Sequence, residues 1–278
     1  MFELFERSAF ANSKNITRLY STSFSKGIRS LEKKFHDPVY GIYGFVRYTD
    51  EIVDTFHRFN QQELLVEFRE ETYKAIDREI SLNPVLYAFQ SVVHKYGIER
   101  SLIEAFFESM EMDLHRRKYD NELYRQYIYG SAEVVGLMCL RVFTEDDVQL
   151  YESLKGFARR LGAAFQKVNF LRDVKSDYEE LGRVYFPAVD FDDFTMAMKE
   201  AIEKDIQEDF DIAYKGILRL PKSSRFGVYL AYIYYLQLFK QIKRTQPARI
   251  LKQRISVPEN KKMVLLFETY FREKLNLL

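Results

Sequence analysis

Apolar residues recur at intervals of three and four along most of the chain, a spacing that places them on one face of an α-helix. No run of alternating apolar and polar residues is long enough to compete with this pattern as a strand. The pattern predicts one all-α domain over residues 1–278 with a central helical bundle. We expect helices at residues 3–19, 38–57, 61–81, 84–96, 99–117, 121–142, 145–178, 194–218, 222–245 and 258–276.

Residues that typically begin or end helices mark several of these boundaries. Asp37 and Asn83 each precede a proline, and each predicts an N-cap followed by proline in the first turn. Thr144 is followed by three acidic residues and predicts another helix start, because carboxylates stabilise the positive end of the helix dipole. Gly97 and Gly182 predict helix ends.

Two of the predicted helices carry a pair of aspartates four residues apart. Asp50 and Asp54 lie in GFVRYTDEIVDTF. Asp173 and Asp177 lie in QKVNFLRDVKSDYEELGRVYFP. Residues four apart share a helix face, where two like charges repel by about 0.2–0.5 kcal/mol. A bound cation shared by the two carboxylates would explain why they lie together in a largely apolar helix, because it would remove their repulsion.

Each pair extends into a longer polar stripe at steps of three and four residues. Mg²⁺ takes hard oxygen ligands and is typically held by one or two carboxylates plus substrate phosphates. Two facing stripes therefore predict a small Mg²⁺ cluster that holds a diphosphate, with arginines completing the charge balance. A solvated face explains a single such motif, but two copies beside arginines favour the metal site. The stripes are Tyr43, Arg47, Asp50 and Asp54, and Gln166, Asn169, Asp173 and Asp177, with Arg172 beside Asp173.

The composition and the absence of other motifs argue against several other classes of function. The chain has 42 Lys and Arg against 41 Asp and Glu, a net charge of +1 that gives no indication of a nucleic-acid partner. Cys139 is the single cysteine, which excludes an internal disulfide, indicates a reducing, cytoplasmic setting and fits a core residue. The four histidines lack metal-ligand spacing, and no nucleotide-binding or serine-hydrolase loop is present. No apolar run approaches the ~18 residues of a membrane span.

A basic run lies between residues 240 and 262. A solvated face, a clamp for a diphosphate and attraction to anionic lipid are all open interpretations of it. The run consists of Lys240, Lys243, Arg244, Arg249, Lys252, Arg254, Lys261 and Lys262.

Several stretches resemble the squalene/phytoene synthase family of head-to-head prenyl transferases, over most of the chain. YSTSFS resembles the family's early Ser-x-Ser-Phe element, and RYTDEIVD resembles its first aspartate motif. ARRLGAAFQKVNFLRDVKSDYEELGRVYFP resembles the second aspartate motif, and YIYGSAEVVGLM resembles the helix that lines the prenyl pocket. The resemblance implies an isoprenoid-synthase-type bundle around an apolar cavity, with the two aspartate motifs facing each other across its mouth.

The family's site residues carry over to matching positions of this chain. The implied metal ligands are Asp50, Asp54, Asn169, Asp173 and Asp177. The implied catalytic residues are Asp50, Asp54, Asp173, Asp177, Arg47, Arg172 and Tyr185. The implied substrate-binding residues are Ser21, Ser23, Phe24, Tyr43, Arg47, Tyr129, Gln166, Asn169, Arg172, Arg183, Tyr235, Arg254 and Lys262.

The resemblance also implies an activity. Mg²⁺, or Mn²⁺ in its place, would stabilise the diphosphate that leaves a prenyl diphosphate. The VGLM end of the pocket helix favours the phytoene branch, in which two geranylgeranyl diphosphates yield phytoene through a cyclopropylcarbinyl diphosphate without NADPH. A squalene or dehydrosqualene synthase that uses farnesyl diphosphate is one alternative. A non-catalytic assembly or lipid-binding member is the other, although all four aspartates are present. The insoluble product suggests peripheral contact with a membrane.

Glu133 departs from the family pattern, because the pocket helix usually has a glycine at this position. A charge beside an apolar tunnel is costly unless it is paired. We therefore expect Glu133 to point away from the tunnel or to pair locally. The substitution bears on the shape of the tunnel and on the length of chain that it accepts.

Overall fold

The computed structural model describes residues 1–115, 118–180, 182–187, 189 and 191–274. These residues form helices and no strand, apart from an isolated bridge between Lys118 and Val184, so the all-α prediction is confirmed. The helices are α1 (Phe2–Tyr20), α2 (Thr22–Arg29), α3 (His36–Thr55), α4 (Gln61–Arg78), α5 (Pro84–Tyr96), α6 (Arg100–His115), α7 (Asn121–Ile128), α8 (Val134–Thr144), α9 (Val148–Lys175), α10 (Met196–Ile217), α11 (Lys222–Lys243), α12 (Pro247–Ile250) and α13 (Glu259–Lys274). A 3₁₀ turn covers Lys33–Phe35, and π-helical turns cover Tyr129–Glu133 and Ser176–Glu180.

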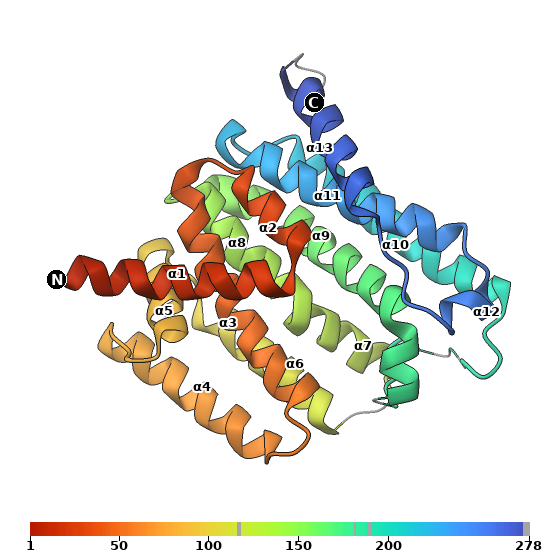
Figure 1. The fold of residues 1–278 in the computed structure, drawn as a ribbon, viewed down its shortest axis with the longest axis horizontal. Helices are drawn as coiled ribbons and strands as arrows, with labels where there is room; N and C mark the ends of the chain where they lie inside the picture. Colours follow the sequence, from red (N-terminus) through yellow and green to blue (C-terminus); the bar gives the residue numbers. More distant parts are fainter. Residues whose placement is uncertain (116–117, 181, 188, 190, 275–278) are drawn as a thin grey trace.

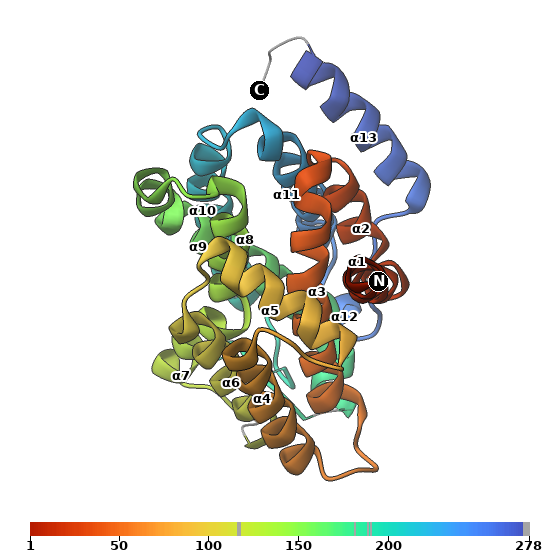
Figure 2. The ribbon, with the colours of Figure 1, turned by 90° about the vertical axis from the view of Figure 1, so that its left-hand side faces the viewer.

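The helices α3 and α9 lie in the middle of the bundle (Figure 1). Helix α1 packs across α3 and α5, while α8 and α10 pack along α9. Helix α13 lies on the outside of the bundle against α11 (Figure 2). Within the described residues, no helix combines the length and the apolar character that a membrane crossing requires.

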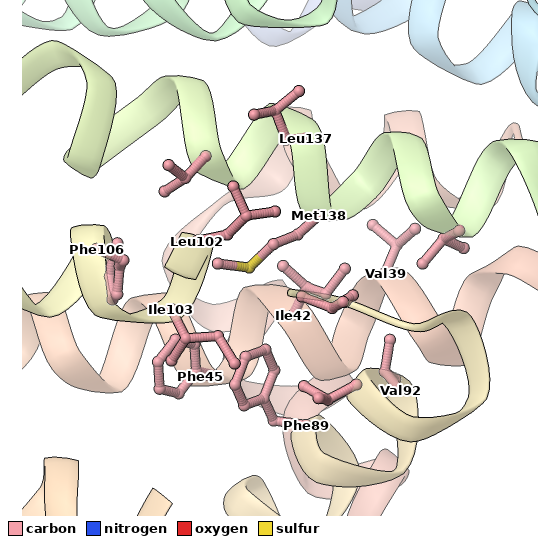
Figure 3. Packing of buried hydrophobic residues seen from close by; sticks show 14 of the residues in the cluster. Val39, Ile42, Phe45, Phe89, Val92, Leu102, Ile103, Phe106, Leu137 and Met138 are labelled. Carbon is pink, nitrogen blue, oxygen red and sulfur yellow. The ribbon is translucent and has the colours of Figure 1, made fainter. Parts of the chain in front are cut away.

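Buried apolar residues form two large clusters, one on each side of the bundle. The first joins α3, α5, α6 and α8, and Figure 3 shows side chains of these four helices interlocking. Phe45 on α3 stacks on Phe89 of α5 with 3.9 Å between ring centroids, and it contacts Phe107 of α6 edge-on at 5.5 Å. The second cluster joins α9, α10 and α11. The site described below lies between the two clusters.

The predicted helix starts are confirmed at one position and shifted at two. The Asn83 side chain accepts hydrogen bonds from the backbone N–H groups of Val85 and Leu86, as an N-cap does. Asp37 lies inside the first turn of α3, which begins at His36. Thr144 is the last residue of α8, and Asp147 is the N-cap of α9 instead, because its carboxylate accepts from the N–H of Leu150 at 2.9 Å.

The predicted helix ends are positions where glycine is needed. Gly97 has φ +60° and follows α5, and Gly182 has φ +64° and follows the second π-helical turn. This left-handed conformation is accessible to glycine at little cost. Both predictions are confirmed.

Two of the long predicted helices are interrupted. The helix expected over 121–142 consists of α7, a π-helical turn and α8, and the helix expected over 145–178 consists of α9 and a second π-helical turn. Such turns change the direction of a helix and are frequent at functional sites. The pattern also missed α2 and α12, which are short. The predicted ends 116–117 and 275–276 lie outside the described residues.

Glycines allow the helices around the cavity to approach closely. A Cβ at Gly130 would lie 2.3 Å from the carbonyl oxygen of Ala105, and one at Gly162 would lie 2.5 Å from that of Ala132. A backbone carbonyl cannot move aside as a flexible side chain can. The packing of α6 and α9 against the first π-helical turn therefore depends on the missing side chains.

We expect Gly130→Ala to lower the free energy of unfolding by about 1–3 kcal/mol, because the added methyl overlaps backbone atoms. Gly156→Ala is the matched control, since a Cβ at that exposed position of α9 meets nothing within 4 Å. There the substitution should stabilise the helix by about 0.5–1 kcal/mol. Thermal unfolding of both variants checks this pair, and equal melting temperatures would contradict the close approach.

Candidate active site

A cavity of about 650 Å³ opens between the two apolar clusters. Its volume lies in the range of roughly 300–1,000 Å³ that is typical of small-molecule sites. Along both α3 and α9, the lining residues are mostly apolar near the start of the helix and polar toward its C-terminal end. On α9 the lining extends from Leu154 to Asp173, a span of ~28 Å at the helical rise. The cavity is therefore a deep apolar pocket with one polar end.

The polar end brings the two aspartate pairs onto the wall of the same cavity. Asp50 and Asp54 come from α3, Asp173 comes from α9, and Asp177 comes from the π-helical turn that follows α9. The two pairs are far apart in the sequence, and only the packing of α3 and α9 around one cavity brings them together.

Burial and mutual repulsion make these carboxylates hard to ionise. Burial raises the pKa of Asp50 to about 8, the charge of Asp54 raises it further, and the opposing effect of Arg47 is smaller. Burial also raises the pKa of Asp177 to about 7, with added repulsion from Asp173 and Asp54. Ionising all of these carboxylates at the polar end is therefore unfavourable unless further positive charge is bound there.

On the α3 side, one arginine serves two acidic residues. Arg47 donates to Glu51, and its Nη1 lies 3.9 Å from Oδ2 of Asp50. Its guanidinium lies over the ring of Tyr20, 4.4 Å from the centroid. Its Nε is buried and has no hydrogen-bond partner among the described residues. Arg47 is therefore held in place at the cavity wall with a donor to spare.

On the α9 side, two arginines converge on one aspartate. The Nε of Arg172 lies 3.0 Å from both carboxylate oxygens of Asp173, and the Nε of Arg254 donates to its Oδ1 at 2.8 Å. Four residues earlier on α9, the side-chain oxygen of Asn169 is buried without a hydrogen-bond partner in the described structure. A buried polar atom is normally satisfied, so an unpaired amide oxygen beside carboxylates fits a ligand position for a cation.

Asp113 is the functional candidate that the sequence analysis missed. It is buried on α6, where its carboxylate accepts hydrogen bonds from the hydroxyls of Tyr127 at 2.6 Å and Tyr185 at 3.1 Å. Its backbone oxygen accepts from Nη2 of Arg183, whose Nη1 donates to Asp54 at 2.8 Å. Burial raises the pKa of Asp113 to about 6, and Arg183 opposes this rise. The buried arginine thus links α6 to the first aspartate pair.

The sequence does contain a signal for Asp113. Ile103, Phe106, Met110 and Asp113 follow one another at steps of three and four, so the aspartate lies on the buried face of α6. A charged residue on an otherwise apolar helix face indicates a buried partner. The same criterion identified the two aspartate pairs.

Most of the residues predicted for the site line this cavity. Their proposed roles stay predictions, because the structure gives their positions only. The lining residues among them are Ser21, Phe24, Tyr43, Arg47, Asp50, Asp54, Gln166, Asn169, Arg172, Asp173, Asp177, Arg183, Tyr185, Tyr235 and Arg254.

Three predicted substrate-binding residues are not part of the described lining. Ser23 is half-buried on α2, next to the lining residue Phe24. The ring of Tyr129 lies beneath the guanidinium of Arg159, 5.2 Å from it. The Nζ of Lys262 lies 3.4 Å from Oγ1 of Thr22, at the edge of the site. Contact with substrate at these positions would require a different arrangement of side chains.

Glu133 both points away from the cavity and pairs locally. Its carboxylate accepts from Nε of Arg159 at 2.5 Å, and it does not belong to the described lining. The charge is therefore compensated on the outer side of the first π-helical turn. Cys139 lines the cavity, and burial raises the pKa of its thiol to about 12, which keeps it protonated and unreactive.

The residues at the polar end fit a magnesium ion. Within the described ranges, no three acidic, histidine or cysteine side chains are close enough to hold a metal by themselves. Mg²⁺ does not require such a cage, because it keeps several waters and shares its ligands with substrate phosphates. The donors present are hard oxygens, and the Asn169 oxygen is unpaired among the described residues. The pKa values of Asp50 and Asp177 are raised by burial and by neighbouring acids, so a bound cation would favour their ionised forms.

An all-α bundle around an apolar cavity with acidic helix faces at one end defines the isoprenoid-synthase type of fold. The crystal structure of a dehydrosqualene synthase in complex with a ligand superposes with a TM-score of 0.81 and covers 97% of this chain and 98% of its own, at 23% identity. The crystal structure of a squalene synthase from Alicyclobacillus acidocaldarius superposes with a TM-score of 0.75. It covers 86% of this chain and 94% of its own, at 21% identity. The predicted fold type is confirmed.

The sequence profile of the squalene/phytoene synthase family matches residues 17–261, and the chain belongs to this family. Phytoene synthase 1 of Solanum lycopersicum is 27% identical over 89% of this chain, which spans 64% of that protein's length. Phytoene synthase of Arthrospira platensis is 27% identical over 91% of this chain and 89% of its own. The 4,4′-diapophytoene synthase of Staphylococcus haemolyticus is 26% identical over 70% of this chain and 67% of its own length.

We expect the metal-free protein to lose thermal stability as the pH rises through the raised pKa of Asp50, about 8. The unfolded chain releases this proton near pH 4, so the folded state holds more protons between these values and stability falls as pH increases. Asp50→Asn should flatten this decline, whereas Glu67→Gln on the exposed face of α4 should leave it unchanged. Melting temperatures in EDTA across this range test the prediction, and equal slopes for Asp50→Asn and wild type would refute it.

Proposed function

We propose that the protein condenses two molecules of geranylgeranyl diphosphate head to head into phytoene, through a cyclopropylcarbinyl diphosphate, with release of two diphosphates. The observation that carries this proposal is the deep apolar cavity with two aspartate pairs at its polar end. Prenyl chains suit the apolar wall, and a diphosphate suits the polar end. When bound there, Mg²⁺ or Mn²⁺ would supply Lewis-acid stabilisation of the departing diphosphate.

The chain's own cations would bind and orient the diphosphate. Arg47, Arg172 and Arg254 all line the polar end, and a guanidinium presents parallel N–H donors that match phosphate oxygens. Arg254 has 68% of its side chain exposed, so it can reach a diphosphate at the rim of the cavity. Negative charge that develops as the carbon–oxygen bond breaks would be stabilised by these donors in place.

Aromatic side chains next to the polar end would protect the carbocation that remains. Phe170 stacks on Tyr185 at 4.1 Å, and Phe165 stacks on Tyr235 at 3.9 Å, with all four rings on the lining. The face of an aromatic ring attracts a cation. The apolar wall excludes water, which would otherwise quench the cation before the second prenyl chain attacks it.

The length of the cavity favours a long prenyl chain. Phe157 lies near its far end, where the ring is part of the lining and the guanidinium of Arg219 lies 5.3 Å from the ring centroid. From the polar end, α9 offers a wall of ~28 Å along the cavity, which is ample for an extended geranylgeranyl chain. Two of the relatives named above are phytoene synthases, which also favours a product formed by proton loss without NADPH.

A synthase that joins two farnesyl diphosphates is the second candidate. It is favoured by the likeness to a 4,4′-diapophytoene synthase and by the overlap with a dehydrosqualene synthase structure. The same polar end would serve this reaction, and only the occupied depth of the apolar wall would differ. The two candidates are therefore separated by the length of the preferred substrate.

Asp54→Asn should fold normally and lose activity by on the order of a hundredfold or more, because it removes one of the carboxylates proposed to hold the metal ion that stabilises the departing diphosphate. Asp146→Asn, an exposed aspartate before α9, is the matched control and should retain full turnover. Initial rates on geranylgeranyl diphosphate and binding of Mn²⁺ measured by electron paramagnetic resonance test both variants. Wild-type turnover in Asp54→Asn would return the aspartate pair to the solvated-face interpretation.

Geranylgeranyl diphosphate should be turned over faster than farnesyl diphosphate, with phytoene as product and no effect of NADPH. Phe157→Ala should enlarge the cavity and increase the relative rate on geranylfarnesyl diphosphate, because a bulky ring is removed from the wall near its far end. Phe5→Ala, which alters a contact between α1 and Tyr87 outside the cavity, is the control. Faster turnover of farnesyl diphosphate by the wild type would favour the second candidate instead.

A further inference from the structure

Positive charge is concentrated in one part of the chain. Residues 212–258 contain ten of the 42 Lys and Arg and none of the 41 Asp and Glu. The rest of the chain therefore carries 32 basic against 41 acidic residues. A net charge near zero thus hides a strongly basic segment on an otherwise acidic protein.

Part of this charge forms an exposed surface at the end of α11 and around α12. Lys240, Lys243 and Arg244 are three and four residues apart, so they share one side of α11. Arg249 and Lys252 follow in and just after α12, and all five side chains are exposed. None of the five forms an ion pair with a carboxylate of the described residues. We call these five residues the basic surface.

The basic surface lies beside the polar end of the cavity. Helix α12 packs against α9, which carries Asp173 (Figure 1). Two residues beyond Lys252, Arg254 pairs with Asp173 at the cavity rim. A planar anionic partner on the basic surface would therefore lie next to the polar end of the cavity.

Apolar side chains are exposed on the neighbouring helix. Met263, Val264 and Phe267 on α13 are 42, 53 and 57% exposed, and Lys261 and Lys262 precede them. Helix α13 packs on α11, the helix that carries most of the basic surface (Figure 2). Basic residues beside exposed apolar residues are typical of helices that lie in the interface of an anionic membrane.

We propose that the basic surface docks the protein onto an anionic lipid bilayer, so that the cavity opens beside the membrane. The choice of lipid over another polyanion rests partly on the proposed function, whose product is a hydrocarbon that leaves water for a bilayer. The exposed apolar residues of α13 support the same choice, because a soluble polyanion offers them no apolar phase. The attraction is electrostatic and is screened by salt.

The test is the triple variant Lys240→Gln, Lys243→Gln and Arg244→Gln in a vesicle flotation assay. Each basic residue near an anionic surface strengthens binding by about fivefold, so the triple variant should bind on the order of a hundredfold more weakly to phosphatidylcholine vesicles that contain phosphatidylglycerol. Wild type should bind these vesicles, lose that binding at high salt, and not bind phosphatidylcholine alone. The matched control removes three exposed basic residues from α1, α4 and α5 by Arg7→Gln, Arg78→Gln and Lys95→Gln, and it should bind as wild type.

Equal binding by the two triple variants, or equal binding of wild type to neutral and anionic vesicles, would overturn the proposal. A short RNA duplex bound more tightly than the anionic vesicles through the same three residues would overturn the assignment to lipid. Flotation needs no substrate, so it is independent of the proposed reaction. Turnover in detergent, where the triple variant should equal wild type, reports on that reaction separately.

Discussion

The central constraint on this protein is the repulsion between carboxylates that the fold brings to one end of an apolar cavity. Asp50 and Asp177 come from different helices, and burial and neighbouring acids raise their pKa values to about 8 and about 7. A fold that served stability alone would not gather these groups. The arrangement becomes favourable when divalent cations neutralise the carboxylates and link them to an anionic diphosphate, which is what the proposed reaction requires.

The surrounding structure holds the repelling groups in place. Arg183 is buried and donates both to Asp54 and to the backbone of Asp113, so a single guanidinium ties α3 to α6 beneath the polar end. Close packing without side chains at Gly130 and Gly162 fixes the cavity walls at a distance that larger residues would not permit. The carboxylates therefore cannot separate to relieve their repulsion, and the site is prepared for its ligands before they bind.

The local parts of this account could be predicted from the sequence, and the long-range parts could not. Helical spacing and the caps at Asn83 and Gly97 depend on residues a few positions apart, so pattern alone predicts them. The aspartate pairs could be predicted because the two members of each pair lie four residues apart in one helical stretch, and this spacing occurs twice in the chain. Asp113 does not belong to a repeated pattern of aspartates within its helix, and its role depends on Arg183, which lies 70 residues further along. The π-helical turn around Gly130 was missed because the apolar spacing does not mark it, and the close packing of Gly130 on α6 joins residues far apart in the sequence.

Calorimetric titration of inorganic diphosphate into the protein tests most directly whether the two aspartate pairs exist to share cations with a diphosphate. With Mg²⁺ present, the account predicts saturable binding, because the metal links like-charged groups on protein and ligand. In EDTA it predicts no measurable binding, since the uncovered carboxylates repel the diphosphate. Binding of equal affinity with and without Mg²⁺ would contradict the account, and would assign the anion to the arginines alone.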